Sequence, residues 1–429
     1  MIYGGDEISA VVLDVGTSST RLGYAGEETP RCILPTSYGY MPRTVKTVDP
    51  SGMEVETTSR DLYVGENGVG RWRAGMEVGN PMADGLIYDW SPTKDIIEHA
   101  FTKGLEVNPQ EHPVLVTEPA WNTAANRERM AEIMFEEFQV PAFYIANNSV
   151  LSAFASGKGT ALIIDIGKSQ ANVTPVVDGF VLRKGIAHSS IPALVQNSAH
   201  SILAHGDQTR PAIDLLPYQL IDKKQIVEPN QPPRCVLRDD RIAVTAPSWR
   251  NWALQREVEE WMMACGAVLP REYSEEHARS WARKTYEFPT GFNSSFGGER
   301  FIPGDIFFTT HHLPPTQSQT QHPATLPELL TAALRATEPD LRPALFNNVV
   351  LTGGGACLPG MGDRIGYELQ KLAGGQKVRL HVPGNMLERR YSSWIGGSIL
   401  GSLGTFHQLW ISKQEWQEHG KSIVASRCK

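Results

Sequence analysis

Three short apolar segments, each ending at glycine, constrain the fold of this chain more than any other feature. They read AVVLDVGTSST at Ala10–Thr20, ALIIDIGK at Ala161–Lys168 and VVLTGGG at Val349–Gly355. Short β-branched runs that end at glycine are typical of buried strands entering tight turns. The sequence therefore predicts three such strands, far apart in the chain, within an α/β protein.

The first two segments resemble each other. In both, the apolar run continues into Asp-x-Gly, and a second strand follows the turn, at Thr20–Ala25 and at Ala171–Val177. Asp-x-Gly is common, so two unrelated hairpins would also produce this pattern. The shared strand–turn–strand order favours a duplicated α/β half-domain, with Asp14 and Asp165 in equivalent places.

Apolar residues at helical spacing predict helices between these strands. The predicted helices are Ala124–Phe138, Asn147–Ala155, Glu257–Val268, Leu326–Ala336 and Ser392–Trp410. In the last helix, we expect Ile395, Ile399, Leu403 and Phe406 to share one side.

Three polar segments with a high density of Pro, Gln, Ser or Thr predict surface loops or insertions. They are Lys46–Asp61, Val227–Arg238 and His312–Pro327. No carboxylate or cysteine is patterned around His311, His312 and His322, so a solvated loop is favoured over a metal site there.

Composition excludes several classes of protein. The net charge of −7 disfavours direct DNA binding as the main task, because such proteins carry a basic domain or stripe; a local patch is left open. The chain contains no run of 18 apolar residues, so no membrane-spanning helix is predicted. The first residues, MIYGGDEISA, lack the basic residues followed by an apolar stretch that are typical of a signal peptide. Five scattered cysteines without CxxC predict reduced thiols and no zinc site.

The two Asp-x-Gly turns are candidate phosphate sites. Successive backbone N–H groups at a turn of glycine and small polar residues form a nest for anions. If the halves face each other, the two turns would hold a polyphosphate from both sides, with Asp14 and Asp165 favouring Mg²⁺ held through water. The turn residues are Gly16, Thr17 and Ser18 in one half and Gly167, Lys168 and Ser169 in the other.

The third turn, Gly353–Gly355, has no side chains and allows the backbone to approach a ligand closely. Each of the three turns alone is weak evidence for a binding site, because a glycine turn more often has only a structural role. Their combination and order are more specific. The chain contains neither GxxxxGK[ST] nor, after the first strand, GxGxxG, which argues against a P-loop NTPase and a dinucleotide-binding fold.

Longer segments resemble the actin superfamily. Leu13–Arg31 and Ile163–Phe180 are similar to its two phosphate loops, Val349–Ile365 to its adenosine motif, and Glu388–Trp416 to its C-terminal signature. The resemblance covers nearly the whole chain and is weakest at Lys46–Asp61 and Asp207–Thr325. The first residues and EFPTGFNSSFGGERF at Glu287–Phe301 are similar to nuclear actin-related subunits shared by chromatin-remodelling and histone-acetyltransferase complexes.

The resemblance implies a duplicated ribonuclease-H-like ATPase fold with four subdomains around a nucleotide cleft. Subdomain 1 would comprise residues 1–36, 86–165 and 389–429, and subdomain 2 residues 37–85. Subdomain 3 would comprise residues 166–206 and 326–388, and subdomain 4 residues 207–325 with inserted loops.

The resemblance also implies ATP with Mg²⁺ in the cleft, held by the three turns together with Arg21 and Arg390. Arg21 stands where actin has lysine, so the charge is kept. Lys168 stands where actin has aspartate, and Asn148 and Asn172 replace the glutamine and histidine that position the attacking water. Positioning dominates phosphoryl transfer, so we expect ATP to be bound with little or no hydrolysis. The alternatives are that the two asparagines still order the water, and that the chain is a hydrolysing, filament-forming actin-like ATPase.

The family implies nuclear assembly with actin on a helicase-SANT-associated helix of a remodeller ATPase or acetyltransferase scaffold, with another actin-related protein as a further candidate partner. Direct DNA contact would be weak at most, and the divergent segments disfavour a homopolymer. A helix-binding groove would lie at Phe154, Phe180, Ile399, Leu400, Leu403 and Thr405; alternatively, some of these residues belong to the core. The C-terminal signature disfavours a sugar kinase or a chaperone ATPase.

Overall fold

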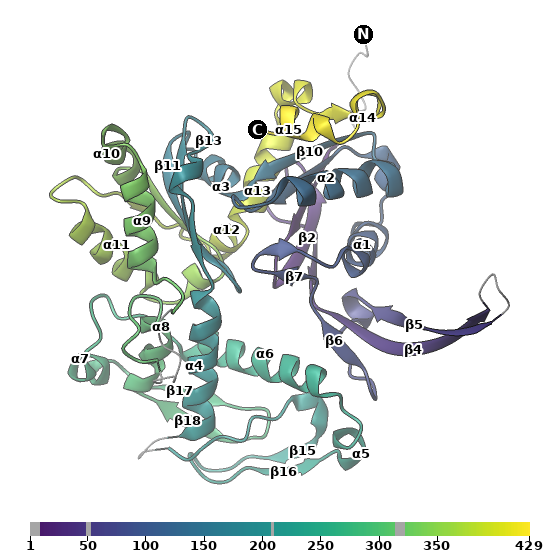
Figure 1. Cartoon of the computed structure of the whole chain (residues 1–429). Helices are drawn as coiled ribbons and strands as arrows, with labels where there is room; N and C mark the ends of the chain where they lie inside the picture. The colour runs from purple at the N-terminus through teal and green to yellow at the C-terminus, as the bar shows by residue number, and fades with distance from the viewer. Residues whose placement is uncertain (1–8, 49–52, 207–209, 314–321) are drawn as a thin grey trace.

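The computed structural model describes residues 9–48, 53–206, 210–313 and 322–429. Two six-stranded sheets form the centres of two halves that lie side by side (Figure 1). The first sheet has the order β21-β10-β9-β1-β2-β3, and the second runs β13-β12-β11-β19-β20 with β14 paired to β12. The strands of the first sheet are β1 (Val11–Val15), β2 (Ser19–Tyr24), β3 (Cys32–Pro35), β9 (Val114–Glu118), β10 (Ala142–Asn147) and β21 (Ile411–Ser412). Those of the second are β11 (Ala161–Ile166), β12 (Ala171–Val177), β13 (Phe180–Val181), β14 (Ala187–Ser189), β19 (Val349–Thr352) and β20 (Leu380–His381).

The two halves repeat the same local plan. Strand β1 pairs antiparallel with β2 and parallel with β9, just as β11 pairs antiparallel with β12 and parallel with β19. The turns are closed by the same bond, in which Gly16 N donates to Ser19 O (3.1 Å) and Gly167 N to Gln170 O (2.8 Å). Asp14 faces Arg21 across its hairpin, and Asp165 faces Asn172 across the other. The duplicated α/β fold predicted from the sequence is confirmed.

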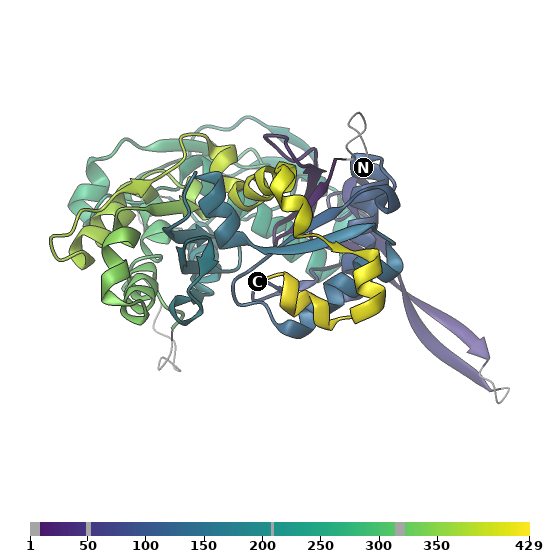
Figure 2. The ribbon, with the colours of Figure 1, turned by 90° about the horizontal axis from the view of Figure 1, so that it is seen from above.

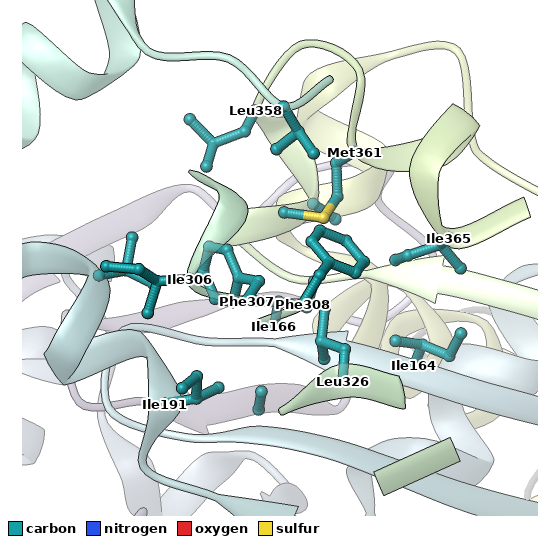
Figure 3. Packing of buried hydrophobic residues seen from close by; sticks show 14 of the residues in the cluster. Ile164, Ile166, Ile191, Ile306, Phe307, Phe308, Leu326, Leu358, Met361 and Ile365 are labelled. Atoms are coloured by element: carbon teal, nitrogen blue, oxygen red, sulfur yellow. The ribbon is translucent and has the colours of Figure 1, made fainter. Parts of the chain in front are cut away.

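Each half has its own hydrophobic core. In the second half, Ile164 and Ile166 of β11 pack beneath the aromatic side chains of Phe307 and Phe308 and against α9 and α11 (Figure 3). The helices of the first half are α1 (Trp90–His99), α2 (Ala124–Glu132), α3 (Asn148–Ala155), α13 (Ser392–Ser402), α14 (Lys413–His419) and α15 (Ser422–Arg427). Those of the second are α4 (Ile191–His205), α5 (Asp239–Ile242), α6 (Pro247–Cys265), α7 (Glu275–Ser280), α8 (Ile302–Asp305), α9 (Leu326–Ala336), α10 (Arg342–Phe346), α11 (Met361–Leu372) and α12 (Met386–Arg390).

The described residues of Lys46–Asp61, predicted as a polar loop, belong instead to two paired strands, and residues 49–52 lie outside the described part of the chain. Strands β4 (Tyr38–Val48) and β5 (Glu54–Tyr63) pair antiparallel along their whole length, and β6 (Glu77–Gly79) pairs with the base of β4. Figure 2 shows this ribbon projecting from the body. The prediction was wrong because charged residues hid the β-branched residues that favour a strand. Short strands β7 (Met82–Ala83) and β8 (Leu86–Ile87) follow.

The other two segments predicted as loops differ from each other. Val227–Arg238 is a loop only at its start, because β16 (Arg234–Leu237) pairs with β15 (Ile221–Gln225). A further hairpin joins β17 (Lys284–Glu287) to β18 (Asn293–Phe296). Within His312–Pro327, residues 314–321 lie outside the described part of the chain, and α9 begins at Leu326.

Most of the predicted helices are present, with changed bounds. Helix α9 begins and ends as predicted, α2 continues as a π-helix over Ile133–Glu137, and α3 starts one residue late. Helix α6 starts at Pro247, well before the predicted Glu257. The early start was missed because the first turns bury only Trp249 and Ala253, which do not form a run of aliphatic residues.

The predicted helix Ser392–Trp410 is wrong in its length, and its four apolar residues do not share one environment. Helix α13 ends at Ser402, and Ile399 and Leu403 are exposed (39% and 42%), whereas Phe406 is buried. Glycines form the buried side instead, because a Cβ at Gly396 would overlap the backbone of Leu151 in α3, and a Cβ at Gly397 would lie 2.8 Å from Val12. Close packing at these glycines buries the backbone of the helix, and Trp394 is the large side chain that α13 buries beside them.

Candidate functional site

A cavity of about 600 Å³ lies between the two halves. Both Asp-x-Gly turns, the triple-glycine turn and the two predicted water-positioning asparagines line it. Of the residues predicted from the sequence to bind nucleotide or metal or to position water, all line this cavity: Asp14, Gly16, Thr17, Ser18, Arg21, Asn148, Asp165, Gly167, Lys168, Ser169, Asn172, Gly353, Gly354, Gly355 and Arg390.

The two turns touch each other across the cavity. The hydroxyls of Thr17 and Ser169 lie 2.8 Å apart. Asn80 was not predicted from the sequence. Its side-chain Nδ2 donates a hydrogen bond to the carbonyl oxygen of Thr17 at 2.9 Å and so helps to hold the first turn in place. Two nests of backbone N–H groups therefore face one space, as an anion with several phosphate groups would require.

Asp14 accepts three side-chain hydrogen bonds at the end of β1. Its partners are Arg21 Nη1 (2.5 Å), Thr117 Oγ1 (2.6 Å) and Ser393 Oγ (3.2 Å). Arg21 also lies over the ring of Tyr391, at 5.1 Å. Thr117 and Ser393 were missed in the sequence; the position of Thr117 at the end of a parallel strand was the one signal for it. Arg21 is thus partly neutralised by Asp14, while its Nε is buried without a hydrogen-bond partner among the described residues.

Asp165 occupies the equivalent place in the second half but has fewer donors. Asn172 Nδ2 donates to Asp165 Oδ2 at 3.3 Å, and Thr174 Oγ1 donates to Asn172 Oδ1 at 3.1 Å. Burial, with a further contribution from the nearby carboxylate of Asp14, raises the pKa of Asp165 to about 6, against the opposing bond from Asn172. A cation between the two carboxylates would relieve this penalty, so the pair is chemically suited to a divalent ion.

Lys168 points across the cavity to α6. Its Nζ lies 2.8 Å from Glu259 Oε1, and Gln196 of α4 donates to the same oxygen at 3.1 Å. Glu259 was not predicted, because the register of α6 cannot be read from its sequence. The lysine is therefore held by a carboxylate in this structure.

The triple-glycine turn has one position that requires glycine and one that faces open space. Gly353 has φ +95°, and a Cβ there would overlap Asp165 Oδ1 and the carbonyl of Ile166. Gly354 has helical φ and ψ, and its Cβ would meet nothing within 4 Å. The backbone at Gly354 is therefore open to close approach by a ligand.

This difference gives a matched test. Gly353→Ala should lower the free energy of unfolding by about 2 kcal/mol or more, because the methyl group both strains the backbone and displaces Asp165. Gly354→Ala should leave it within about 0.5 kcal/mol of the unmodified protein. Urea unfolding of the nucleotide-free variants measures both, and equal stabilities would contradict the assigned geometry.

A second contact between the halves closes the space beside the cavity. We call it the cleft clasp: Val69, Trp72, Met76 and Val78 on one side, and Thr245, Ser248 and Trp249 on the other. Trp249 Nε1 donates to Val69 O, and Trp72 Nε1 to Thr245 Oγ1, both at 2.9 Å, while Val78 N donates to Ser248 Oγ at 2.8 Å. Val69, Met76 and Trp249 share one buried cluster. The segment between β5 and β6 is thereby fastened to the start of α6.

The residues predicted to form a partner groove lie on α3, β13 and α13 and just beyond α13. Phe154, Phe180, Ile399 and Leu403 expose 36% to 62% of their surface; we call these four the apolar face. Thr405 is exposed beside it, whereas Leu400 packs against the core of the first half. Leu400 therefore belongs to the core and not to the predicted groove, which was the alternative interpretation of these residues.

The described residues contain no group of three or more side chains suited to a metal among His, Cys, Asp and Glu. The Nε2 atom of His312 lies 3.3 Å from Oδ2 of Asp305, and the imidazole ring packs edge to face with the ring of Tyr273. The described cysteines are free thiols. Within the described ranges, no helix combines the length and apolar character that crossing a bilayer requires.

Duplicated sheets whose equivalent turns face one cavity define the actin-like class of α/β proteins. A sequence profile of the actin family, described as Actin, matches residues 5–429, and the chain belongs to this family. Proteins named Actin-related protein 4 are similar along their whole length. Those of Emericella nidulans, Schizosaccharomyces pombe and Oryza sativa subsp. japonica are 39%, 36% and 34% identical, cover 100% of this chain and are covered over 98%, 99% and 100% of their own length.

Proposed function

We propose that this actin-related protein is a nuclear structural subunit of chromatin-remodelling or histone-acetyltransferase complexes that binds ATP with Mg²⁺ and hydrolyses it little or not at all. One observation carries the proposal: a single cavity gathers both phosphate-type turns and both aspartates in a chain that resembles proteins named Actin-related protein 4 from end to end.

The residues of the cavity fit this ligand. Beyond the N–H groups of Gly16 and Gly167, which close the turns, the residues that follow each glycine offer backbone N–H groups, and the buried Arg21 Nε is a donor that lacks a partner among the described residues. Asp14 and Asp165 would hold Mg²⁺ through its water shell, and the open backbone at Gly354 leaves room for the nucleoside side. When bound, Mg²⁺ would neutralise phosphate charge.

The surroundings of Asn172 support slow hydrolysis. Its amide oxygen accepts from Thr174 and its amide nitrogen donates to Asp165, which fixes the side chain, and at 1% exposure it offers little access for a water. Asn148, at the first turn of α3, accepts from the neighbouring Ser149 at 3.3 Å and is too short to reach as glutamine does. Neither side chain can act as a base as histidine can.

The nucleotide in the purified protein tests this proposal. We expect mostly ATP, not ADP, when the protein is denatured and its nucleotide is separated by anion-exchange chromatography. Steady-state turnover should stay at least about tenfold below that of actin, because misplacement of the attacking water costs rate steeply. Mostly ADP, or turnover as fast as that of actin, would contradict slow hydrolysis.

The apolar face supports a helix-in-groove partner, for which we propose the helicase-SANT-associated helix with actin alongside. Ile399→Asp with Leu403→Asp should weaken binding of that helix by at least about tenfold, because two exposed apolar contacts are replaced by charges. Leu372→Asp, a similarly exposed leucine on α11, is the control. Pull-down with the tagged helix measures the loss, and undiminished binding by the double variant would refute the assignment.

The divergent segments also support the proposal that this chain does not form filaments alone. Sedimentation in Mg²⁺ and salt should leave it in the supernatant, and a pellet of the purified protein would support the alternative of a filament-forming ATPase.

A further inference from the structure

A second hollow, of about 360 Å³, lies behind α6 and shares no residue with the nucleotide cavity. It is formed where β15 and β17 approach α6, at the lower edge of the molecule in Figure 1. Four carboxylates line it, together with aromatic side chains. Its residues are Tyr218, Ile221, Asp222, Lys224, Glu257, Glu260, Tyr286, Glu287, Phe288 and Pro289.

Three of the four carboxylates already have a cationic partner. Asp222 pairs with Arg238 at 3.0 Å, Glu287 with Lys224 at 2.6 Å, and Glu260 lies 4.0 Å from Arg256. Glu257 differs from them: it is only 6% exposed, and its Oε2 is buried without a hydrogen-bond partner among the described residues. Burial, together with Glu260, raises the pKa of Glu257 to about 7. Leaving a buried carboxylate unpaired is unfavourable unless a ligand supplies the missing charge.

Aromatic rings complete the hollow. Tyr286 and Phe288 pack edge to face with their centroids 4.8 Å apart, and Tyr218 stands at the opening with 63% of its surface exposed. Ring faces attract cations, and a carboxylate among rings is the arrangement that recognises an alkylammonium group. A carboxylate can pair with an ammonium or with a guanidinium, but the compact head of a lysine needs less room than a planar guanidinium to reach a side chain that is only 6% exposed.

We propose that this hollow, which we call the Glu257 pocket, binds the ammonium group of a lysine side chain presented by a partner protein. The aliphatic stem of the lysine would pass Tyr218 and its head would pair with Glu257. Because the other three carboxylates are already paired, the attraction for a positively charged partner would come mainly from Glu257. The pocket shares no lining residue with the nucleotide cavity.

Isothermal titration of the full-length protein tests the proposal. The probe is a 12-residue peptide of three lysines spaced by Gly-Ser, compared with twins in which the lysines are replaced by Nε-acetyl-lysine or by arginine. We expect the lysine peptide to bind at least about tenfold tighter than the acetylated twin, which has no charge to pair with Glu257. We also expect it to bind tighter than the arginine twin.

Two variants and a control locate the binding. Glu257→Gln keeps the shape of the side chain and should weaken lysine-peptide binding by about tenfold. Tyr218→Ala removes an exposed ring without disturbing the core and should weaken it by about threefold. Glu338→Gln, an exposed carboxylate beside α9, should change it less than about twofold. Equal binding of the lysine and acetylated peptides, equal binding of the arginine twin, or unchanged binding by Glu257→Gln would each overturn the proposal.

Discussion

Trp249→Ala is expected to release bound nucleotide at least about tenfold faster than the unmodified protein. Trp249 is 1% exposed, fills the centre of the cleft clasp and donates its indole N–H to Val69 O at 2.9 Å. Truncating a buried tryptophan costs about 3–5 kcal/mol. Because the lost contacts join the two sides of the clasp, the segment between β5 and β6 should separate from α6 and open the space beside the cavity.

The measurement is a chase experiment. Protein loaded with a fluorescent ATP analogue is mixed with excess ATP, and the loss of fluorescence gives the release rate. Trp281→Ala, which removes a 44% exposed tryptophan elsewhere in the same half, is the matched control and should release nucleotide at the normal rate. Trp249→Phe should fall in between, because it keeps an aromatic ring while losing the bond to Val69 and part of the buried volume. An unchanged release rate in Trp249→Ala would show that the clasp does not restrict access.

Asp14→Ala should abolish stable nucleotide binding and also weaken the fold. The substitution leaves Arg21, Thr117 and Ser393 without their shared acceptor. Removing one member of a buried ion pair costs about 3–5 kcal/mol, because the remaining charge stays buried and unpaired. It also removes one of the two carboxylates proposed to hold Mg²⁺. We expect nucleotide occupancy after purification to fall below about one tenth.

Two further variants separate the causes. Asp14→Asn keeps an acceptor oxygen but removes the charge, so it should retain more of the stability than Asp14→Ala while still losing nucleotide. Asp340→Ala removes an exposed aspartate and should change neither quantity. Nucleotide content is measured by chromatography and stability by urea unfolding. Full nucleotide occupancy in Asp14→Ala would refute the role assigned to this carboxylate.

The parts of the site that sequence could predict are those that short-range geometry determines. The Asp-x-Gly turns at Gly16 and Gly167 close with the same backbone bond, and Gly353 needs its positive φ, so the residue types themselves report the conformation. The equivalence of Asp14 and Asp165 followed from the repeated strand–turn–strand order. Turn chemistry and the repeated order were therefore enough for the turn residues and the two aspartates, whereas Arg21, Asn148, Asn172 and Arg390 followed from the resemblance to actin.

Long-range packing limited the rest. Apart from Trp394, the buried residues of α13 are serines and glycines, which carry no apolar signal, so helical periodicity followed the isoleucines and leucines instead. The hairpin of β4 and β5 was missed because its strands are mostly polar. The subdomain boundaries remain a prediction, as do the roles of the site residues.

The sequence by itself determined the duplicated strands, their turns and the two equivalent aspartates, because each depends on local backbone conformation and on a pattern that repeats along the chain. Only the tertiary structure decided which partners those residues have: Arg21 pairs with Asp14 and Lys168 with Glu259, Trp249 closes the clasp, and Glu257 is left unpaired. The physical reason is that hydrogen bonds, ion pairs and burial depend on distances between elements far apart in the chain, and residue spacing does not encode those distances.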